Sequence, residues 1–334
     1  MKNLKHRYRI RHIAIALSVY ASLHANSVWA KDAANACRSG MPHQEHGRTL
    51  EVSNDEMAKE GAKRGQGYLC TINGDRKSIG DGYIQTYTQL RPDGTPLAIG
   101  FRFPHTTFNS LPTIQYDGLN CYDINGNGKL DFDGDIAGGL NAAECSGGHS
   151  VVLDFPAKNK IAPFKWGLVN WQSHGHTPGD VYDAPHFDFH FFTQDMIARN
   201  FIRVGPCALL IDCDDMVTAR KPIPAGYVHP DYVDVGAAES RSGNHLVDLS
   251  APEWQGVPFT ETWLYGAYDG KITFWEPMIT VAYLKTKPDM CKDLKLPTFY
   301  QENGYYPTRY CIRYRPMSDE YTVSLEGLTY RQAR

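Results

Sequence analysis

The sequence HFDFHF at residues 186–191 alternates strictly between phenylalanine and ionisable side chains. Successive side chains of a β-strand point to opposite faces, so His186, Asp188 and His190 share one face and the three phenylalanines share the other. The phenylalanine face belongs in a hydrophobic core. The polar face is harder to explain as ordinary solvated surface, because all three of its residues are of metal-binding type. This segment therefore predicts a strand that joins a core to a candidate site.

Most of the remaining chain also has the composition of strands, separated by clusters of Gly, Pro, Asp and Asn. The first two strands flank the turn sequence 92–96 and predict a hairpin. Helix is expected only at 53–64, after Ser53 or Asn54, and at 195–202. The pattern predicts a mainly β fold, a barrel or sandwich of antiparallel strands with few short helices. Besides the strand at 186–192, the predicted strands are 83–90 and 97–103, which form the hairpin, and 151–155, 164–171, 260–268, 271–283, 310–314 and 321–330.

The first thirty residues have the three parts of a secretory signal peptide. Five basic residues are followed by an apolar run from Ile13 to Ala25, and Val28 and Ala30 are small residues at the −3 and −1 positions of a cleavage site. The alternative is an uncleaved anchor, but a membrane span needs roughly 20 apolar residues and this run is shorter. No later stretch is long enough to span a membrane. We expect cleavage after residue 30 and export to the periplasm or the medium.

Charge and cysteine content agree with an exported protein. The chain has 34 basic and 37 acidic residues, and loss of the signal peptide would leave 29 against 37, a net charge of −8. An acidic chain does not suit nucleic-acid binding. The eight cysteines form no C-x-x-C motif, so in an oxidising compartment four disulfides are expected. Nearest-neighbour pairing predicts the bonds 37–70, 121–145, 207–213 and 291–311.

The same features suggest a domain organisation. Residues 31–80 are expected to be a leader segment with one short helix, and 81–285 a β-rich main domain. An insertion at about 113–148 interrupts that domain, and the Cys/Tyr-rich residues 286–334 form a C-terminal extension clipped by the 291–311 bond.

The insertion contains a loop that resembles the start of an EF-hand or dockerin calcium loop. Oxygen ligands stand at positions 1, 3 and 5, glycine at position 6 and Asp131 at position 9. Gly134 occupies position 12, where a bidentate acid is expected, although Asp133 or Asp135 could replace it. The alternative is a solvated turn tethered by a disulfide. The predicted calcium ligands are Asp123, Asn125, Asn127, Asp131 and Asp135.

A second candidate site collects around the HFDFHF strand. His174 and His176 precede it, and His245 and Glu276 lie further along the chain. His186 and His190 are about 13 Å apart on a regular strand, so they share one ion only if both lean inward or the strand is bulged. A hydrogen-bonded His–Asp–Glu network is the competing interpretation. The candidate ligands of a zinc, iron, copper or nickel ion are His176, His186, Asp188, His190, His245 and Glu276.

The block from Gly175 to Phe191 resembles the GHxP…PHFDFHF signature of a family of exported bacterial proteins of unknown function. The segments 83–111, 224–227, 243–245, 252–253 and 265–278, the last ending in FWEPM, are similar to other motifs of that family. The resemblance covers roughly residues 80–285 and implies one β-rich exported unit with the same polar cluster. It implies no reaction.

Three functions are consistent with these observations. The first is an exported metal-binding protein with a small molecule or metal ion as its partner, which could be a metal-dependent enzyme. The second is a binding module without chemistry, and the third is a structural envelope protein, either of which could form homo-oligomers. The chain has no H-E-x-x-H, G-x-S-x-G or P-loop motif, so the common zinc-protease, serine-hydrolase and nucleotide-binding classes lose support.

Overall fold

The computed structural model describes residues 70–91, 93–130, 144–157 and 161–334. The predicted signal peptide, the helix expected at 53–64, and two predicted calcium ligands, Asp131 and Asp135, lie outside these residues. The chain divides into two compact units. The first comprises Met1–Thr71 and Gln89–Leu97, and the second comprises Ile72–Thr88 and Ala98–Arg334.

The described part of the first unit is a tight turn. The amide of Gly94 donates to the carbonyl of Arg91, and the amide of Arg91 donates to the carbonyl of Thr95. The Asp93 carboxylate accepts a hydrogen bond from the Thr95 amide at 2.9 Å. Gly94 has a φ of +86°, which glycine adopts at little steric cost. The Asp-Gly sequence thus forms the turn that it predicts.

One sheet has six strands in the order β1-β2-β3-β15-β14-β12. The pairs β3–β15, β15–β14 and β14–β12 are antiparallel. Three of the six strands come from residues 286–334, so the C-terminal segment is built into this sheet. The strands are β1 (Cys70–Ile79), β2 (Gly82–Leu90), β3 (Pro96–Pro104), β12 (Asp289–Asp293), β14 (Arg309–Arg315) and β15 (Glu320–Glu326).

The other sheet has seven strands in the order β4-β5-β6-β11-β10-β9-β8, and all its pairs are antiparallel. β6 and β11 lie side by side at its centre although 78 residues separate them in the chain. The strands are β4 (His149–Asp154), β5 (Trp166–Gln172), β6 (His186–Phe192), β8 (Tyr232–Glu239), β9 (Gly243–Asp248), β10 (Glu261–Tyr268) and β11 (Lys271–Thr280).

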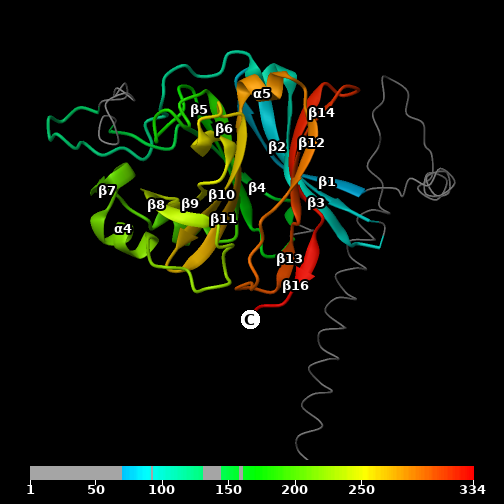
Figure 1. Ribbon diagram of the computed structural model, residues 1–334. Helices are drawn as coiled ribbons and strands as arrows, with labels where there is room; N and C mark the ends of the chain where they lie inside the picture. The colour runs from blue at the N-terminus through cyan, green and yellow to red at the C-terminus, as the bar shows by residue number, and fades with distance from the viewer. Residues whose placement is uncertain (1–69, 92, 131–143, 158–160) are drawn as a thin grey trace, which may run out of the picture. The chain divides into compact units, whose positions relative to one another are not determined.

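Short elements complete the described fold (Figure 1). β13 (Gly304–Tyr306) and β16 (Thr329–Arg331) form a small two-stranded sheet close to the C-terminus. The remaining elements are the strand β7 (Val204–Cys207), the helices α3 (Met196–Asn200), α4 (Cys213–Ala219) and α5 (Val281–Lys285), and the 3₁₀ turns η1 (His105–Phe108), η4 (Ala208–Leu210) and η5 (Pro252–Gln255).

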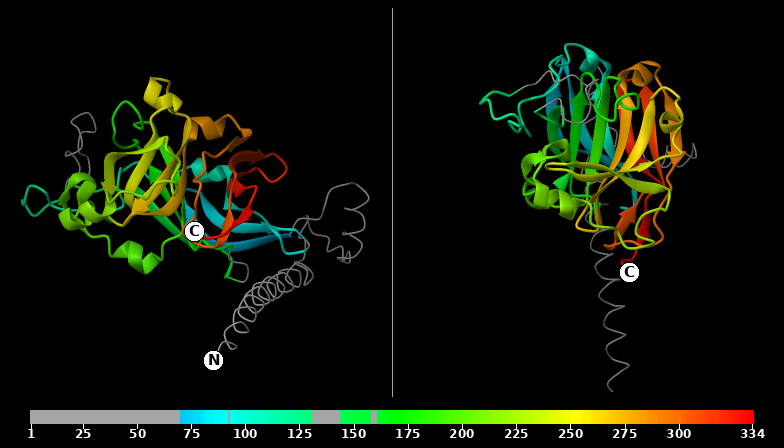
Figure 2. Two further views of the ribbon diagram at one scale, coloured as in Figure 1. Left: turned by 60° about the horizontal axis from the view of Figure 1, so that its bottom comes forward. Right: turned by 60° about the vertical axis from the view of Figure 1, so that its left-hand side comes forward.

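Aromatic side chains hold the two large sheets together within the second unit. Phe187, Phe189 and Phe191 of β6 are buried and pack on Phe101 and Phe103 of β3. The ring centroids of Phe101 lie 5.5 Å from those of Phe189 and 4.9 Å from those of Phe191. Figure 2 shows the two sheets from two further sides. Because the phenylalanine face of β6 packs against the other sheet, the ionisable residues of β6 lie on its opposite face.

The predicted fold class is confirmed. The described chain is mainly β with short helices, and because both large sheets are open the architecture is a sandwich rather than a barrel. The disulfides Cys121–Cys145, Cys207–Cys213 and Cys291–Cys311 form as predicted. The remaining predicted pair includes Cys37, which lies outside the described residues.

Two predicted strands end earlier than the sequence pattern indicates. The strand expected over 271–283 stops at Thr280, whose hydroxyl accepts a hydrogen bond from the Tyr283 amide and so caps α5. The strand expected over 321–330 divides into β15 and β16 around Gly327, which has a φ of +66°. In both places a local feature, a helix cap at Thr280 or a turn at Gly327, ends a strand although the surrounding residues have a composition typical of strands.

Candidate metal centre

The ionisable face of β6 looks away from the phenylalanine core. His186, Asp188 and His190 have 0%, 3% and 3% of their surface exposed, so this face is buried as well. In the neighbouring strand β5, Gln172 pairs with His186, Asn170 with Asp188 and Leu168 with His190. On the other side, Met278 of β11 pairs with Asp188. The central strands therefore hold the three ionisable side chains on a rigid platform.

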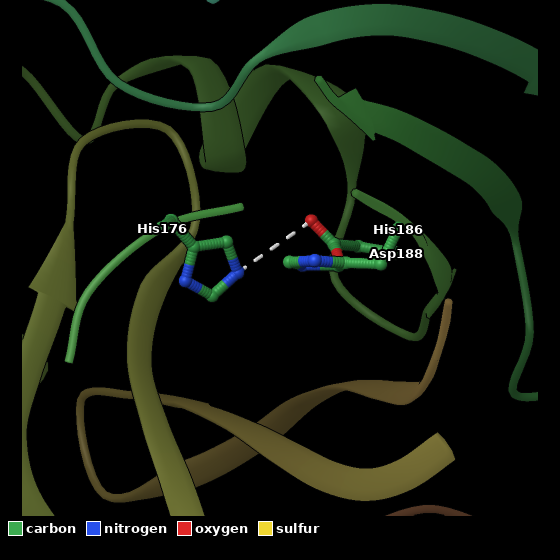
Figure 3. Close-up of side chains that lie close together, drawn as sticks. All are labelled: His176, His186 and Asp188. Carbon is green, nitrogen blue, oxygen red and sulfur yellow. Dashed lines mark ion pairs between the residues drawn. The ribbon is translucent and has the colours of Figure 1, made fainter. Parts of the chain in front are cut away.

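A first group consists of His176, His186 and Asp188 (Figure 3). One ligand atom from each of the three lies within 4.8 Å of the others. The Nε2 atom of His186 lies 3.0 Å from Asp188 Oδ1, and the Nε2 atom of His176, from the loop after β5, lies 3.9 Å from Asp188 Oδ2. Figure 3 shows the His176 ring facing the other two side chains from the opposite side.

The ring orientations in this group are set by the protein backbone. The Nδ1 atom of His186 lies 2.6 Å from the carbonyl oxygen of Ala184, and that of His176 lies 2.8 Å from the carbonyl of Thr177. A carbonyl only accepts hydrogen bonds, so Nδ1 carries the proton and Nε2 of a neutral ring presents a lone pair. Both lone pairs then face the carboxylate of Asp188. An acceptor facing an acceptor requires a proton or a cation between them.

The charge states favour a cation in the first group. Burial, together with the neighbouring His186, lowers the pKa of His176 to about 4, so this ring is neutral at pH 7. Burial acts to raise the pKa of Asp188, but the positive charge and hydrogen bond that a proton on His186 Nε2 supplies outweigh burial and hold that pKa below its usual range; a metal ion can take the place of that proton. Gln172 Nε2 also donates to Asp188 Oδ2 at 3.0 Å. A carboxylate and a neutral imidazole are both in their metal-binding forms.

A second group consists of His190, His245 and Glu276, again with ligand atoms within 4.8 Å of one another. The Nε2 atom of His190 lies 3.2 Å from Glu276 Oε1, and that of His245 lies 3.9 Å from Glu276 Oε2. The Nδ1 atom of His245 is 2.9 Å from the carbonyl of Ala237, which fixes this ring as the backbone fixes the two rings of the first group. β6, β9 and β11 each contribute one residue.

Burial dominates the electrostatics of the second group. It lowers the pKa of His190 to about 3, and it raises the pKa of Glu276 well above the ordinary value, with Asp188 and Glu239 adding to the effect. In the absence of a cation, therefore, a proton on Glu276 is the favoured state at pH 7. A metal ion would replace that proton as the compensating charge.

Residues of both groups, His176 and Asp188 from the first and His190, His245 and Glu276 from the second, border one cavity of about 110 Å³. A single water needs roughly 10–15 Å³ of such volume, so the cavity has room for several waters or a small molecule. Its lining includes three carboxylates, Asp188, Glu239 and Glu276, and none of the described lining residues is a lysine or arginine. The lining also includes apolar side chains, among them Leu209, Leu210, Val235, Trp254 and Met278.

Five of the six predicted transition-metal ligands line this cavity and the sixth, His186, lies beside Asp188; the six form two groups of three. His174 belongs to neither group and contacts Gln115 instead. Sequence reasoning missed Gln172 and Glu239. Gln172 could have been found from the alternation of β5, whereas the alternation of β8, which carries Glu239, is broken at Gly236, where the strand shifts register.

The described part of the predicted calcium loop forms hydrogen-bonded turns. Asp123 Oδ1 accepts from the amide of Gly126 and Oδ2 accepts from that of Gly128, both at 2.7 Å. Asn125 and Asn127 each accept from the amide two residues on. Glu144, which sequence reasoning did not include, accepts from the amides of Ile124 and Asn125.

A third group with metal-ligand residue types, Cys291, Cys311 and Glu326, is not a metal site because its two cysteines are joined in a disulfide. Thiolates, which bind metals, are absent there. No helix in the described ranges is both long and apolar enough to cross a membrane.

Comparison with protein-family models, curated proteins and solved structures finds no match. The resemblance of the histidine block to a family of exported proteins therefore stays a prediction.

Proposed function

We propose that this chain is an exported metalloprotein that binds a divalent transition-metal ion at His176, His186 and Asp188. The observation that carries the proposal is a pair of buried atoms, His186 Nε2 and Asp188 Oδ1. They lie 3.0 Å apart and neither has a further partner among the described residues; with the His186 ring proton on Nδ1, the two atoms face each other as acceptors. Leaving such buried polar atoms without a partner costs about 1–3 kcal/mol each. A cation that both atoms contact would remove this cost.

The surroundings of the three residues support the same proposal. Metal-bound histidines commonly donate their second ring N–H to a carbonyl or carboxylate, as His176 and His186 do here. Two imidazoles and a carboxylate suit zinc, iron, copper or nickel. The first group and the nearby Gln172, which donates to Asp188, thus resemble a ligand set with part of its outer hydrogen-bonding shell in place.

Three protein ligands leave coordination positions for water or a small molecule. Catalytic zinc sites share this arrangement, whereas structural zinc sites are closed by four protein ligands. The Asp188 and His176 side chains border the cavity, so the ion would be reachable from it. A metal-dependent enzyme acting on a small substrate is the most specific form of the proposal. The export signal and the disulfides support a location outside the cytoplasm.

The competing function is a binding or envelope protein in which the cluster is only a hydrogen-bond network. The metal content of the mature chain separates the two. We expect purified protein from metal-replete medium to contain at least one transition-metal ion per chain by elemental analysis, and His176→Ala to contain fewer. His229→Ala, a histidine that does not border the cavity, is the matched control. Metal-free wild type under these conditions would contradict the proposal.

We also propose a structural calcium ion in the loop that begins at Asp123. Asp123→Ala should abolish a calcium-induced rise of the unfolding temperature that the wild type shows in calorimetry, because it removes the ligand at position 1. Asp93→Ala, in the turn of the first unit, serves as a control that removes an exposed acid elsewhere. Equal shifts in wild type and Asp123→Ala would support a plain turn.

A further inference from the structure

The second group repeats the features of the first around a different carboxylate. Glu276 has 3% of its side chain exposed, and its Oε2 atom has no hydrogen-bond partner among the described residues. The Nδ1 atom of His190 is also buried and has no hydrogen-bond partner in the part of the chain that the structure describes. His245 directs Nε2 toward Glu276 because its Nδ1 is bound to the Ala237 carbonyl. An unpartnered carboxylate oxygen faces a histidine lone pair, as at Asp188.

We propose that His190, His245 and Glu276 bind a second divalent transition-metal ion, so that the cavity is bordered by two ions. This inference deepens the proposed function and rests on it for the class of metal. Both groups supply two imidazoles and one carboxylate, so zinc, iron, copper or nickel would suit each of them.

The spacing along β6 argues against one ion shared by all six residues. Ligand atoms bind a transition metal at about 2.0–2.2 Å, so all the ligand atoms of one ion lie within about 4.4 Å of one another. His186 and His190 are four residues apart on a regular strand, which separates their Cα atoms by about 13 Å. Their rings also lean toward different carboxylates, His186 toward Asp188 and His190 toward Glu276. Each carboxylate thus defines its own group.

The charge of the cavity supports a second cation independently of these distances. Its described lining contains Asp188, Glu239 and Glu276 but no lysine or arginine. Burying an unpaired carboxylate charge is costly, so Glu276 can be ionised in this cavity only beside a cation, and the described lining residues supply none. A second divalent ion next to Glu276 would be that cation.

The test is the number of ions that the metal-free mature protein binds. Cobalt(II) is titrated into chelator-treated wild type, His176→Ala, His245→Ala and the double variant, and bound metal is measured by equilibrium dialysis and visible absorption. We expect two ions for the wild type, one for each single variant and none for the double variant. The control His229→Ala should bind two. If His245→Ala fails to fold, Glu276→Gln keeps the side-chain shape and should also bind one.

The outcomes distinguish this inference from the proposed function. A wild type that binds one ion, retained in His245→Ala and lost in His176→Ala, overturns the second site and leaves the first intact. Loss of all binding in either single variant points to one shared ion and also overturns the inference. Two ions retained in both His245→Ala and Glu276→Gln would place the second ion elsewhere. A wild type that binds no ion contradicts both proposals.

Discussion

Replacing Phe189 with alanine is expected to lower the free energy of unfolding by about 3–5 kcal/mol, the range for deleting a buried phenylalanine ring. Phe189 is fully buried at the centre of the contact between the two large sheets. Its ring packs on Phe101 and lies stacked on Phe103, with centroids 5.8 Å apart. Strands from both sheets surround the ring, so little relaxation can fill the space that it leaves. Urea unfolding followed by tryptophan fluorescence measures the change.

Phe201 is the matched control for this substitution. It follows α3 and has 74% of its surface exposed, so Phe201→Ala should change the free energy of unfolding by no more than about 0.5 kcal/mol. A cost below about 1 kcal/mol for Phe189→Ala would mean that the phenylalanine face of β6 does not hold the sheets together. The assignment of the opposite face to a site would then lose its structural basis.

Zinc ion is expected to stabilise the metal-free mature protein by about 2.7 kcal/mol for each site at a concentration one hundred times the dissociation constant. An ion that binds the folded state alone shifts the folding equilibrium toward that state, and His176, from a loop, and His186, from β6, come close together only when the chain folds. Calorimetry with and without zinc measures the rise of the unfolding temperature.

His176→Ala gives the sharpest comparison for this stabilisation. The substitution lies in the cavity wall, where 30% of the side chain is exposed, and it leaves the buried strand β6 unchanged. We expect it to remove the part of the zinc effect that belongs to the first group. The same zinc-induced shift in wild type and His176→Ala would show that zinc binds away from these ligands.

The sequence predicts local structure best where side chains alternate cleanly. Residues 186–192 form β6 with the phenylalanine face in the core, as the alternation indicates. The sequence pattern misses β9 although it carries His245, because its Gly-Asn-His start has no apolar alternation and His245 borders the cavity. Strands that line a polar cavity differ in composition from strands that line a core, and hydrophobic patterns recognise only the latter.

The composition of the candidate site was predictable, but its division into two groups was not. Asp188 and His190 come from one strand, yet Glu276 reaches His190 only because β11 pairs with β6, and His245 joins them only because β9 pairs with β10. Strand order is set by packing between segments that are distant in the chain. The backbone carbonyls that orient His176, His186 and His245 leave no trace in the sequence either.

Anomalous X-ray diffraction at the zinc edge, from crystals of the zinc-loaded mature protein, tests the central claim most directly. We predict a peak in contact with the Nε2 atoms of His176 and His186 and with the carboxylate of Asp188, at metal–ligand distances of about 2.0–2.2 Å. Zinc peaks found only on the protein surface, with Asp188 and His186 paired through a proton, would contradict the claim that this cavity is a metal centre.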